Sequence, residues 1–150
     1  MAELFERHWP RMHRAAFLIT GDAAAAEDIA QEAFLAAIRA LDRFDLRRPL
    51  GPWLHRIAVN RAIDWSRARA LRREVSGAPD EERAEAVGSG IDEELRAALQ
   101  ALGVEQRAVV VLRYVLDLTP GEIAAQLDLP RGTVNSRLRR GLDALGERLR

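Results

Sequence analysis

A polar segment near the middle of the chain limits the folds that the chain can adopt. Residues 76–90, SGAPDEERAEAVGSG, combine Gly, Pro, Ser and acidic residues and contain almost no large apolar residue. Such a composition is typical of a linker between domains. A chain of 150 residues has room for one ordinary domain or two small ones. The segment favours two, at residues 1–75 and 91–150, with 76–90 as an acidic, flexible linker.

Composition favours helices on both sides of this segment. Ala, Leu, Arg and Glu are abundant and β-branched alternation is scarce, so we predict an all-α fold of two small helical domains. The chain has no cysteine, which excludes disulfides and thiolate metal sites. No apolar run approaches the roughly 20 residues that span a bilayer, and the first residues lack a signal-peptide core. We therefore expect a cytoplasmic protein without membrane insertion.

Apolar spacing predicts three helices in the first domain. The first contains Phe5 to Ile19, with Pro10 as a possible bend, and Asp22 caps a second helix that reaches about Leu41. We expect the second helix to bury Ile29, Ala33, Phe34, Ala37, Ile38 and Leu41. Pro52 starts a third helix that ends near Arg73. A turn of about 100° per residue gives this helix a packing side and an available side. The packing side carries Leu54, Ala58, Ala62 and Trp65. The available side carries Arg56, Asn60, Asp64 and Arg67.

The second domain is predicted to contain helices at residues 91–102, 105–116, 120–127 and 131–148. The last two have the form of a helix-turn-helix, because Thr119 and Glu122 form a capping box and a short DLP turn leads to the final helix. The expected apolar seam of that helix is Val134, Leu138, Leu142, Leu145 and Leu149.

The other side of the final helix carries polar and basic side chains suited to DNA. Thr133, Ser136 and Arg140 follow one another at helical spacing, and the full candidate set is Arg131, Thr133, Asn135, Ser136, Arg137, Arg139 and Arg140. Such side chains donate to phosphates and to base edges in a major groove that is about 12 Å wide and admits a helix. An Arg-rich face is often only solvated, but the capped helix, the tight turn and the seam favour DNA recognition.

Charge is sorted along a chain whose net charge is zero. Residues 39–73 contain ten arginines and three acids, and residues 106–150 contain eight and five. Between them, residues 74–105 contain two arginines and nine acids. This pattern suggests two contacts with a polyanion, joined by a segment that avoids polyanions.

Both halves resemble one protein family. The stretches DAAAAEDIAQEAFLAAIRALDRF and GPWLHRIAVNRAIDWSRAR are similar to region 2 of the sigma-70 family, in its extracytoplasmic-function (ECF) subfamily. The stretch LGVEQRAVVVLRYVLDLTPGEIAAQLDLPRGTVNSRLRRGLDALGERL resembles region 4. The resemblance implies a transcription initiation factor that binds core RNA polymerase and promoter DNA. It implies a region 2 domain of three helices and a region 4 helix-turn-helix domain.

The resemblance also assigns residues to partners. Asp28, Gln31 and Glu32 match the polymerase-binding motif, which the family docks on the clamp helices of the largest subunit. Their spacing places them on one helix face, although an ordinary solvated acidic face has the same pattern. The apolar helices of region 4, with Val109, Val110, Leu112 and Val115, form its core and a candidate surface for the flap of the second-largest subunit. Many relatives are held inactive by an anti-sigma factor, so such a partner is expected.

The loop from Asp45 to Pro52 and the start of the third helix match the reader of the minus-ten element. The candidates are Arg47, Arg48, Arg56, Asn60 and Arg61. In the family, melting captures an unstacked base in a protein pocket, which offsets a few kcal/mol of unpairing. Trp53 could stack on a base, but the resemblance assigns it to packing. By the same resemblance, the basic helix of region 4 reads the minus-thirty-five element.

The distance between these two elements tests the role of the linker. About 25 base pairs separate elements with those names, which is about 85 Å. A linker of 15 residues spans at most about 50 Å, and two small domains add about 28 Å between their centres. Both sites can therefore be held only if polymerase keeps the linker extended.

Two other functions compete with this interpretation. A stand-alone helix-turn-helix regulator, with residues 1–73 as a dimerisation domain, would bind a duplex operator tightly without polymerase. An enzyme that handles nucleotides is disfavoured, because no phosphate-binding Gly loop, metal cluster or nucleophile and base pair is recognisable. His8, His13 and His55 lack metal-ligand spacing. We therefore expect no enzymatic activity, cofactor or metal.

Overall fold

The computed structural model describes residues 2–43, 47–76 and 90–149, and every regular element in these ranges is a helix. The first domain contains α1 (Ala2–Thr20), α2 (Ala23–Arg39), the short 3-10 helix η1 (Leu41–Arg43) and α3 (Leu50–Ser76). The second contains α4 (Gly90–Gln100), α5 (Val104–Tyr114), α6 (Pro120–Leu127) and α7 (Arg131–Arg148). The all-α prediction is confirmed.

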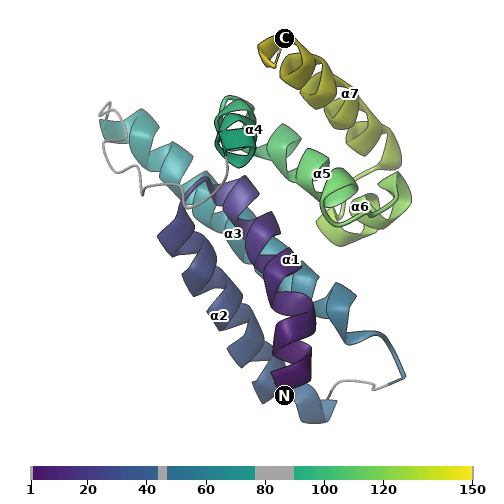
Figure 1. Cartoon of the computed structure of the whole chain (residues 1–150). Helices are drawn as coiled ribbons and strands as arrows, with labels where there is room; N and C mark the ends of the chain where they lie inside the picture. The colour runs from purple at the N-terminus through teal and green to yellow at the C-terminus, as the bar shows by residue number, and fades with distance from the viewer. Residues whose placement is uncertain (1, 44–46, 77–89, 150) are drawn as a thin grey trace.

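In the first domain, α1 packs against both α2 and α3 (Figure 1). α1 continues through Pro10 without a break. Gly21 adopts a left-handed conformation with φ of 71° at the end of α1, and its N–H donates to the Phe17 carbonyl (2.7 Å). The next residue, Asp22, caps α2 by accepting a hydrogen bond from the Ala25 N–H (2.9 Å). A Gly and Asp pair thus turns the chain sharply between two helices.

In the second domain, α5 lies at the centre and contacts α4, α6 and α7. Its fully buried side chains include Val109, Val111 and Leu112, which meet Leu99, Ile123 and Val134 from the other helices. Full burial of one such side chain contributes about 1.5–3 kcal/mol. Val110 is also buried, so these valines and Leu112 belong to the core and are not available as a surface for the polymerase flap.

The two domains also pack against each other, which the sequence did not predict. α4 and α5 contact α1, and α5 contacts α3, so the second domain lies along one side of the first (Figure 1). The predicted linker, apart from its helical end residues Ser76 and Gly90, lies outside the described residues.

Three apolar residues assigned to buried seams are exposed. Ile38 on α2 is 47% exposed, and Leu142 and Leu149 on α7 are 41% and 50% exposed. At about 100° per residue, the buried residues of α7 fall within a stripe of about 60°, and Leu142 lies outside it. That stripe is Val134, Leu138, Gly141 and Leu145. On α2 the stripe is Ala26, Ile29, Ala30, Ala33 and Ala37, and its four alanines let α1 approach closely.

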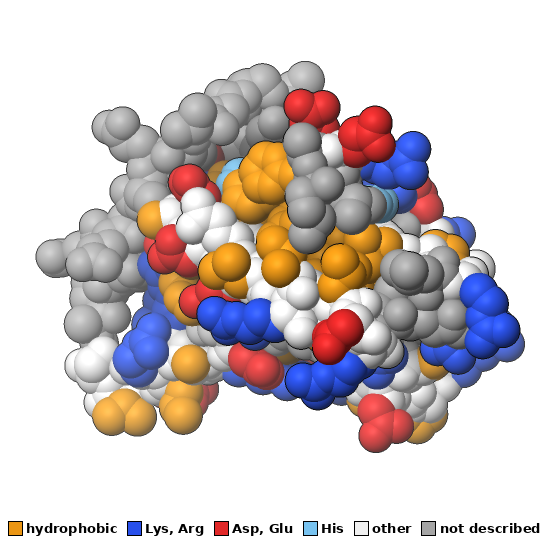
Figure 2. All heavy atoms as spheres, turned by 90° about the horizontal axis from the view of Figure 1, so that it is seen from below, with side chains coloured by type: hydrophobic (Ala, Val, Ile, Leu, Met, Phe, Trp, Pro, Cys, Tyr) orange, Lys and Arg blue, Asp and Glu red, His pale blue; other side chains and the backbone are white. Residues whose placement is uncertain are grey.

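The lower end of the first domain exposes apolar side chains among charged ones (Figure 2). Phe5, near the start of α1, is partly exposed but stacks on Trp9, with ring centroids 4.7 Å apart, and lies 5.3 Å from the ring of Phe34. Arg, Asp and Glu side chains are interspersed on this face. Across the described ranges, no helix combines the length and the hydropathy needed to span a membrane.

Candidate nucleic-acid interface

The helix-turn-helix is built by short-range hydrogen bonds around α6. The Thr119 hydroxyl accepts from the Glu122 N–H (3.1 Å), and the Glu122 carboxylate accepts from the Thr119 N–H (3.0 Å). The hydrogen bond from the Thr119 N–H to the carboxylate, followed by an interaction of the carboxylate with the Thr119 side chain, lowers the pKa of the exposed Glu122 carboxyl. At the other end, Asp128 takes a left-handed conformation with φ of 55°, after which α7 begins at Arg131. The capping box predicted from the sequence is therefore present. The turn at Asp128 changes the direction of the chain between α6 and α7.

The predicted DNA-reading side chains of α7 lie on its accessible surface. Arg131, Asn135, Arg139 and Arg140 are exposed, and Thr133, Ser136 and Arg137 are partly buried. Gly141 is buried where an added Cβ would lie 2.9 Å from a methyl group of Val110. This close approach holds α7 against α5 and leaves its basic side outward.

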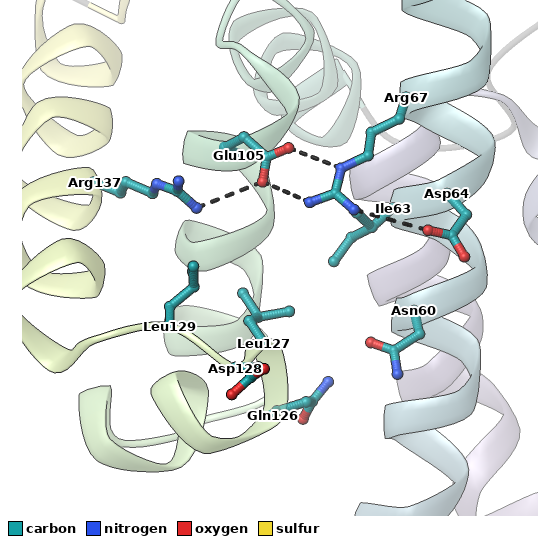
Figure 3. Close-up of a pocket in the computed structure, with 10 residues that line it drawn as sticks. All are labelled: Asn60, Ile63, Asp64, Arg67, Glu105, Gln126, Leu127, Asp128, Leu129 and Arg137. Carbon is teal, nitrogen blue, oxygen red and sulfur yellow. Dashed lines mark hydrogen bonds and ion pairs between the residues drawn. The ribbon is translucent and has the colours of Figure 1, made fainter.

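Of this set, Arg137 forms a salt bridge within the described part of the chain, with Glu105 at the start of α5. Its Nη1 lies 3.5 Å from Oε2 of Glu105, and the arginine side chain is 27% exposed. The same carboxylate accepts two hydrogen bonds from Arg67 of α3, from Nε to Oε1 (2.8 Å) and from Nη2 to Oε2 (2.9 Å). Arg67 also lies 3.8 Å from Asp64. One carboxylate from the second domain thus joins arginines of both domains (Figure 3).

The electrostatics of this cluster follow from its geometry. The hydrogen bonds from Arg67 hold the pKa of Glu105 below its usual value, and the charges of Arg67 and Arg137 add to this effect against partial burial. The pKa of Arg67 is raised, first by its hydrogen bond to Glu105 and then by the charges of Glu105 and Asp64. Both partners therefore remain charged at neutral pH.

A cavity of about 550 Å³ lies beside the cluster, between α3 and the second domain. α3 supplies one wall, and the α6–α7 turn with Glu105 and Arg137 supplies the other (Figure 3). The lining residues are Asn60, Ile63, Asp64, Arg67, Glu105, Gln126, Leu127, Asp128, Leu129 and Arg137. Candidate readers of both promoter elements, Asn60 and Arg137, therefore line the same cavity.

The candidates for the minus-ten element are exposed on the first domain. Arg47 and Arg48 precede α3, and Arg56, Asn60 and Arg61 are exposed residues of α3. Asp45, which begins the matching loop, is outside the described residues. Trp53 is partly buried against the core, in line with its expected packing role.

The candidates for polymerase binding lie together on α2. Asp28, Gln31 and Glu32 are all exposed, and Leu35, one turn further along, is half exposed. Glu32 accepts a hydrogen bond from Nη1 of Arg61 (2.7 Å). A candidate polymerase contact and a candidate DNA contact are therefore joined by an ion pair between two exposed side chains.

Sequence reasoning missed Arg107, which is only 6% exposed. Its guanidinium donates to three carbonyl oxygens, those of Ile19 (2.7 Å), Leu99 (3.0 Å) and Leu102 (3.0 Å). Burial, with the charge of Arg73, lowers its pKa to about 10, so it stays protonated at neutral pH. Its position before the apolar run AVVVL was the available signal, because a charge beside a buried run needs internal partners.

His55, to which the sequence assigned no binding role, lines a second cavity of about 300 Å³. Burial, with the charges of Arg11 and His8, lowers its pKa to about 4, and its Nε2 is buried without a hydrogen-bond partner. Leu116, Leu118 and Gln126 of the second domain cover this cavity. Within the described ranges, no three His, Asp or Glu side chains come together as metal ligands.

Comparison with protein families matches both domains. The model of Sigma-70 region 2 matches residues 4–72, and the model of Sigma-70, region 4 matches residues 92–145. Among curated proteins, the ECF RNA polymerase sigma factor SigW of Bacillus subtilis is 32% identical over 99% of this chain and 88% of its own. SigL of Mycobacterium tuberculosis is 36% identical over 97% of this chain and 86% of its own.

Solved structures give the same result. CnrH, in complex with the cytosolic domain of CnrY, matches with a TM-score of 0.72 and 30% identity over 99% of this chain and 86% of that one. The sigma factor RpoE of Bartonella quintana, in complex with the anti-sigma factor NepR, matches with a TM-score of 0.77 and 22% identity over 99% of this chain and 95% of that one.

These matches define a two-domain transcription factor with a sigma-type helix-turn-helix. The chain belongs to the sigma-70 family, in its ECF subfamily.

Proposed function

We propose that the chain is an initiation factor that binds core RNA polymerase in the cytoplasm and directs it to promoters. The observation that carries this proposal is the presence, in one chain and in the family's order, of two matched regions that each expose a basic helix. In this proposal the chain acts by binding and not by catalysis. Its relatives are named as sigma factors.

Each binding surface has its own role in this proposal. Asp28, Gln31 and Glu32 on α2 dock on the clamp helices of the largest polymerase subunit. Arg47, Arg48, Arg56, Asn60 and Arg61 contact the minus-ten element and help to melt it. The basic side of α7 reads the minus-thirty-five element as duplex, with residues Arg131, Thr133, Asn135, Ser136, Arg137, Arg139 and Arg140.

The domain boundaries follow from the same proposal. Residues 1–75 form the region 2 unit, 76–90 the linker and 91–150 the region 4 unit. The flap of the second-largest subunit meets region 4 through side chains other than the buried Val109, Val110 and Leu112. Because solved relatives include a sigma factor bound to an anti-sigma factor, we also propose a partner of that class for this chain.

Run-off transcription with purified core polymerase tests the proposal. A genomic promoter library should yield transcripts that depend on the chain, and these should be lost when Asp28, Gln31 and Glu32 are all changed to Ala. The matched control is a triple change of exposed residues elsewhere on the first domain, such as Glu27, Arg39 and Arg72. If no transcript depends on the chain and the chain binds a duplex operator tightly by itself, the stand-alone regulator is correct instead.

A further inference from the structure

We infer that the cavity beside His55 is a binding site for a small organic acid, whose anionic group is held by Arg7 and Arg11 of α1 and whose apolar part contacts leucines of the second domain. The cavity has a volume of about 300 Å³ and lies between α1, the first turn of α3 and residues of the second domain. Binding there does not depend on the proposed function, because none of the residues assigned to DNA or polymerase lines this cavity.

Two residues on the wall of this cavity carry a buried polar atom without a hydrogen-bond partner. Within the described part of the chain, Nε2 of His55 and Nε2 of Gln126 are buried in this way, and both residues line the cavity. Gln126 also lines the larger cavity, and its amide group extends toward α3 (Figure 3). Buried polar groups are normally satisfied by the protein or by a bound molecule, because leaving them unpaired is unfavourable. The oxygen atoms of a ligand can accept hydrogen bonds from both nitrogen atoms.

The charge of the wall favours an anion. Arg7 and Arg11 of α1 line the cavity, and none of the described residues that line it is an Asp or a Glu. Arg11 is paired with Asp117, at 2.7 Å. Arg7 forms no ion pair within the described part of the chain. Arg7 therefore contributes a positive charge that no neighbouring acid neutralises.

The two histidines of the wall respond to this positive charge. The pKa of His55 is lowered to about 4, first by burial and then by the charges of Arg11 and His8. The pKa of His8 is also lowered, first by burial and then by the charge of Arg7. Both rings are therefore mainly neutral at neutral pH, because they are partly buried beside positive charge. A bound anion would offset that charge.

Another part of the wall is apolar. Leu116 is buried and Leu118 partly buried in the segment before α6, and Pro52 lies in the first turn of α3. One water needs roughly 10–15 Å³, and an apolar cavity of about 150 Å³ holds a benzene ring, so a cavity of about 300 Å³ has room for a ring and a carboxylate. Small-molecule sites combine apolar walls with a few polar groups. An organic acid therefore fits this wall better than a simple inorganic anion.

Benzoate tests the site, since it joins a carboxylate to an apolar ring. Benzamide has the same shape without the charge, and inorganic phosphate has charge without an apolar part. Calorimetric titration of the full chain at constant pH and ionic strength measures each affinity, and NMR of the histidine rings locates the bound ligand. We expect benzoate to bind about tenfold more tightly than benzamide or phosphate. The ring signals of His55 should shift when benzoate is added, and those of His13, which does not line the cavity, should not.

Three variants test the polar contacts, and circular dichroism establishes that they are folded. Arg7→Gln should weaken benzoate binding by about tenfold, as expected for loss of one charge-assisted contact. Arg39→Gln removes an exposed arginine of α2 outside the cavity and should leave the affinity unchanged. Gln126→Leu should also weaken binding. Without ligand it should keep or raise the melting temperature, because it removes a buried amide nitrogen that has no partner.

Several results would overturn the assignment of this site. If none of the three compounds binds, the cavity holds only water. Equal affinity for benzoate, benzamide and phosphate would exclude a site selective for organic acids. Binding that leaves the His55 signals unchanged, or that Arg39→Gln weakens as much as Arg7→Gln, would place the ligand elsewhere on the chain. A lower melting temperature of Gln126→Leu without ligand would show that the amide is already satisfied, and would exclude Gln126 from the site.

Discussion

The two exposed basic helices, α7 and α3, are both rich in arginine but differ in how many of these arginines are paired with acids. On α7, Arg139 and Arg140 have no ion-pair partner among the described residues, and the helix is held by apolar contacts to its own domain. On α3, Arg61 is paired with Glu32 of α2, and Arg67 with Glu105 of α5. The number of arginines on a helix therefore overstates its free positive charge where neighbouring elements supply acids.

The largest expected effect comes from breaking the packing that holds α7. Gly141→Leu should lower the free energy of unfolding by about 1–3 kcal/mol, because its side chain would overlap Val110. Gly146→Leu on the same helix is the matched control, since nothing lies within 4 Å of an added Cβ there. Urea unfolding measures the difference. Equal stability of the two variants would show that α7 does not depend on the close approach to α5.

The next effect separates recognition from polymerase binding. Arg140→Ala should weaken binding of holoenzyme to the minus-thirty-five element by about tenfold, as expected for loss of one specific arginine contact. Affinity for core polymerase should not change. Arg148→Ala removes the same charge from the last turn of α7 and should leave recognition intact. Footprinting and core-binding titrations distinguish the two, and parallel loss of both activities in Arg140→Ala would indicate a structural role.

A smaller effect follows from acid titration at the covered side of α1. The pKa of His55 is about 4 in the folded chain and near its ordinary 6.5 when unfolded, so the unfolded chain takes up the proton first. The free energy of unfolding should keep the full contribution of the neutral His55 ring above pH 6.5 and should fall as the pH drops toward 4. Since the ring is partly exposed and solvent screens part of the effect, we expect a loss of roughly 1 kcal/mol.

The control for this titration removes the group. In His55→Gln the loss of stability between pH 6.5 and 4 should be smaller, and in His13→Gln this loss should be unchanged. Thermal unfolding across this pH range measures it. The groups that line the cavity with His55 include Arg7, His8 and Arg11 on α1, with Leu116, Leu118 and Gln126 from the second domain. An unchanged step in His55→Gln would assign the acid sensitivity to another group.

The smallest effect concerns the ion pair between α3 and α2. Arg61 and Glu32 are 43% and 57% exposed, so their coupling should be about 0.2–1 kcal/mol. A double-mutant cycle with Arg61→Ala and Glu32→Ala, followed by urea unfolding, measures it. A coupling free energy well above this range would mean that the ion pair between α3 and α2 is stronger than its exposed geometry indicates. The difference between the paired Arg61 of α3 and the unpaired arginines of α7 would then be larger.

Local features of the sequence predicted much of the fold. The capping box at Thr119 and the Gly and Asp turn at residues 21 and 22 act within a few residues, so they could be recognised directly. The predicted helices of the second domain agree with α4–α7 to within about two residues, a normal margin for helix ends. The seams were predicted too wide, because apolar character alone does not show which residues meet a neighbour. Ile38 and Leu142 are exposed for that reason.

The candidate site also contains residues that the sequence could predict and residues that it could not. The exposure of Arg139, Arg140, Asp28 and Gln31 follows from helical periodicity and was predictable. The roles of Glu105 and Arg107 were not, because their partners Arg67 and Ile19 are 38 and 88 residues away in the chain. Such pairings depend on how the two domains come together.

The sequence by itself determined the helices, their caps, the basic side of α7 and the resemblance to the sigma-70 family, since each depends on neighbouring residues or on a continuous motif. Only the tertiary structure decided which arginines are engaged. Arg107 is buried against carbonyl groups at the ends of α1 and α4, Arg67 and Arg137 share one carboxylate, and His55 is covered by the second domain. The physical reason is that hydrogen bonding, desolvation and Coulomb attraction act over a few ångströms of space, whatever the separation along the chain.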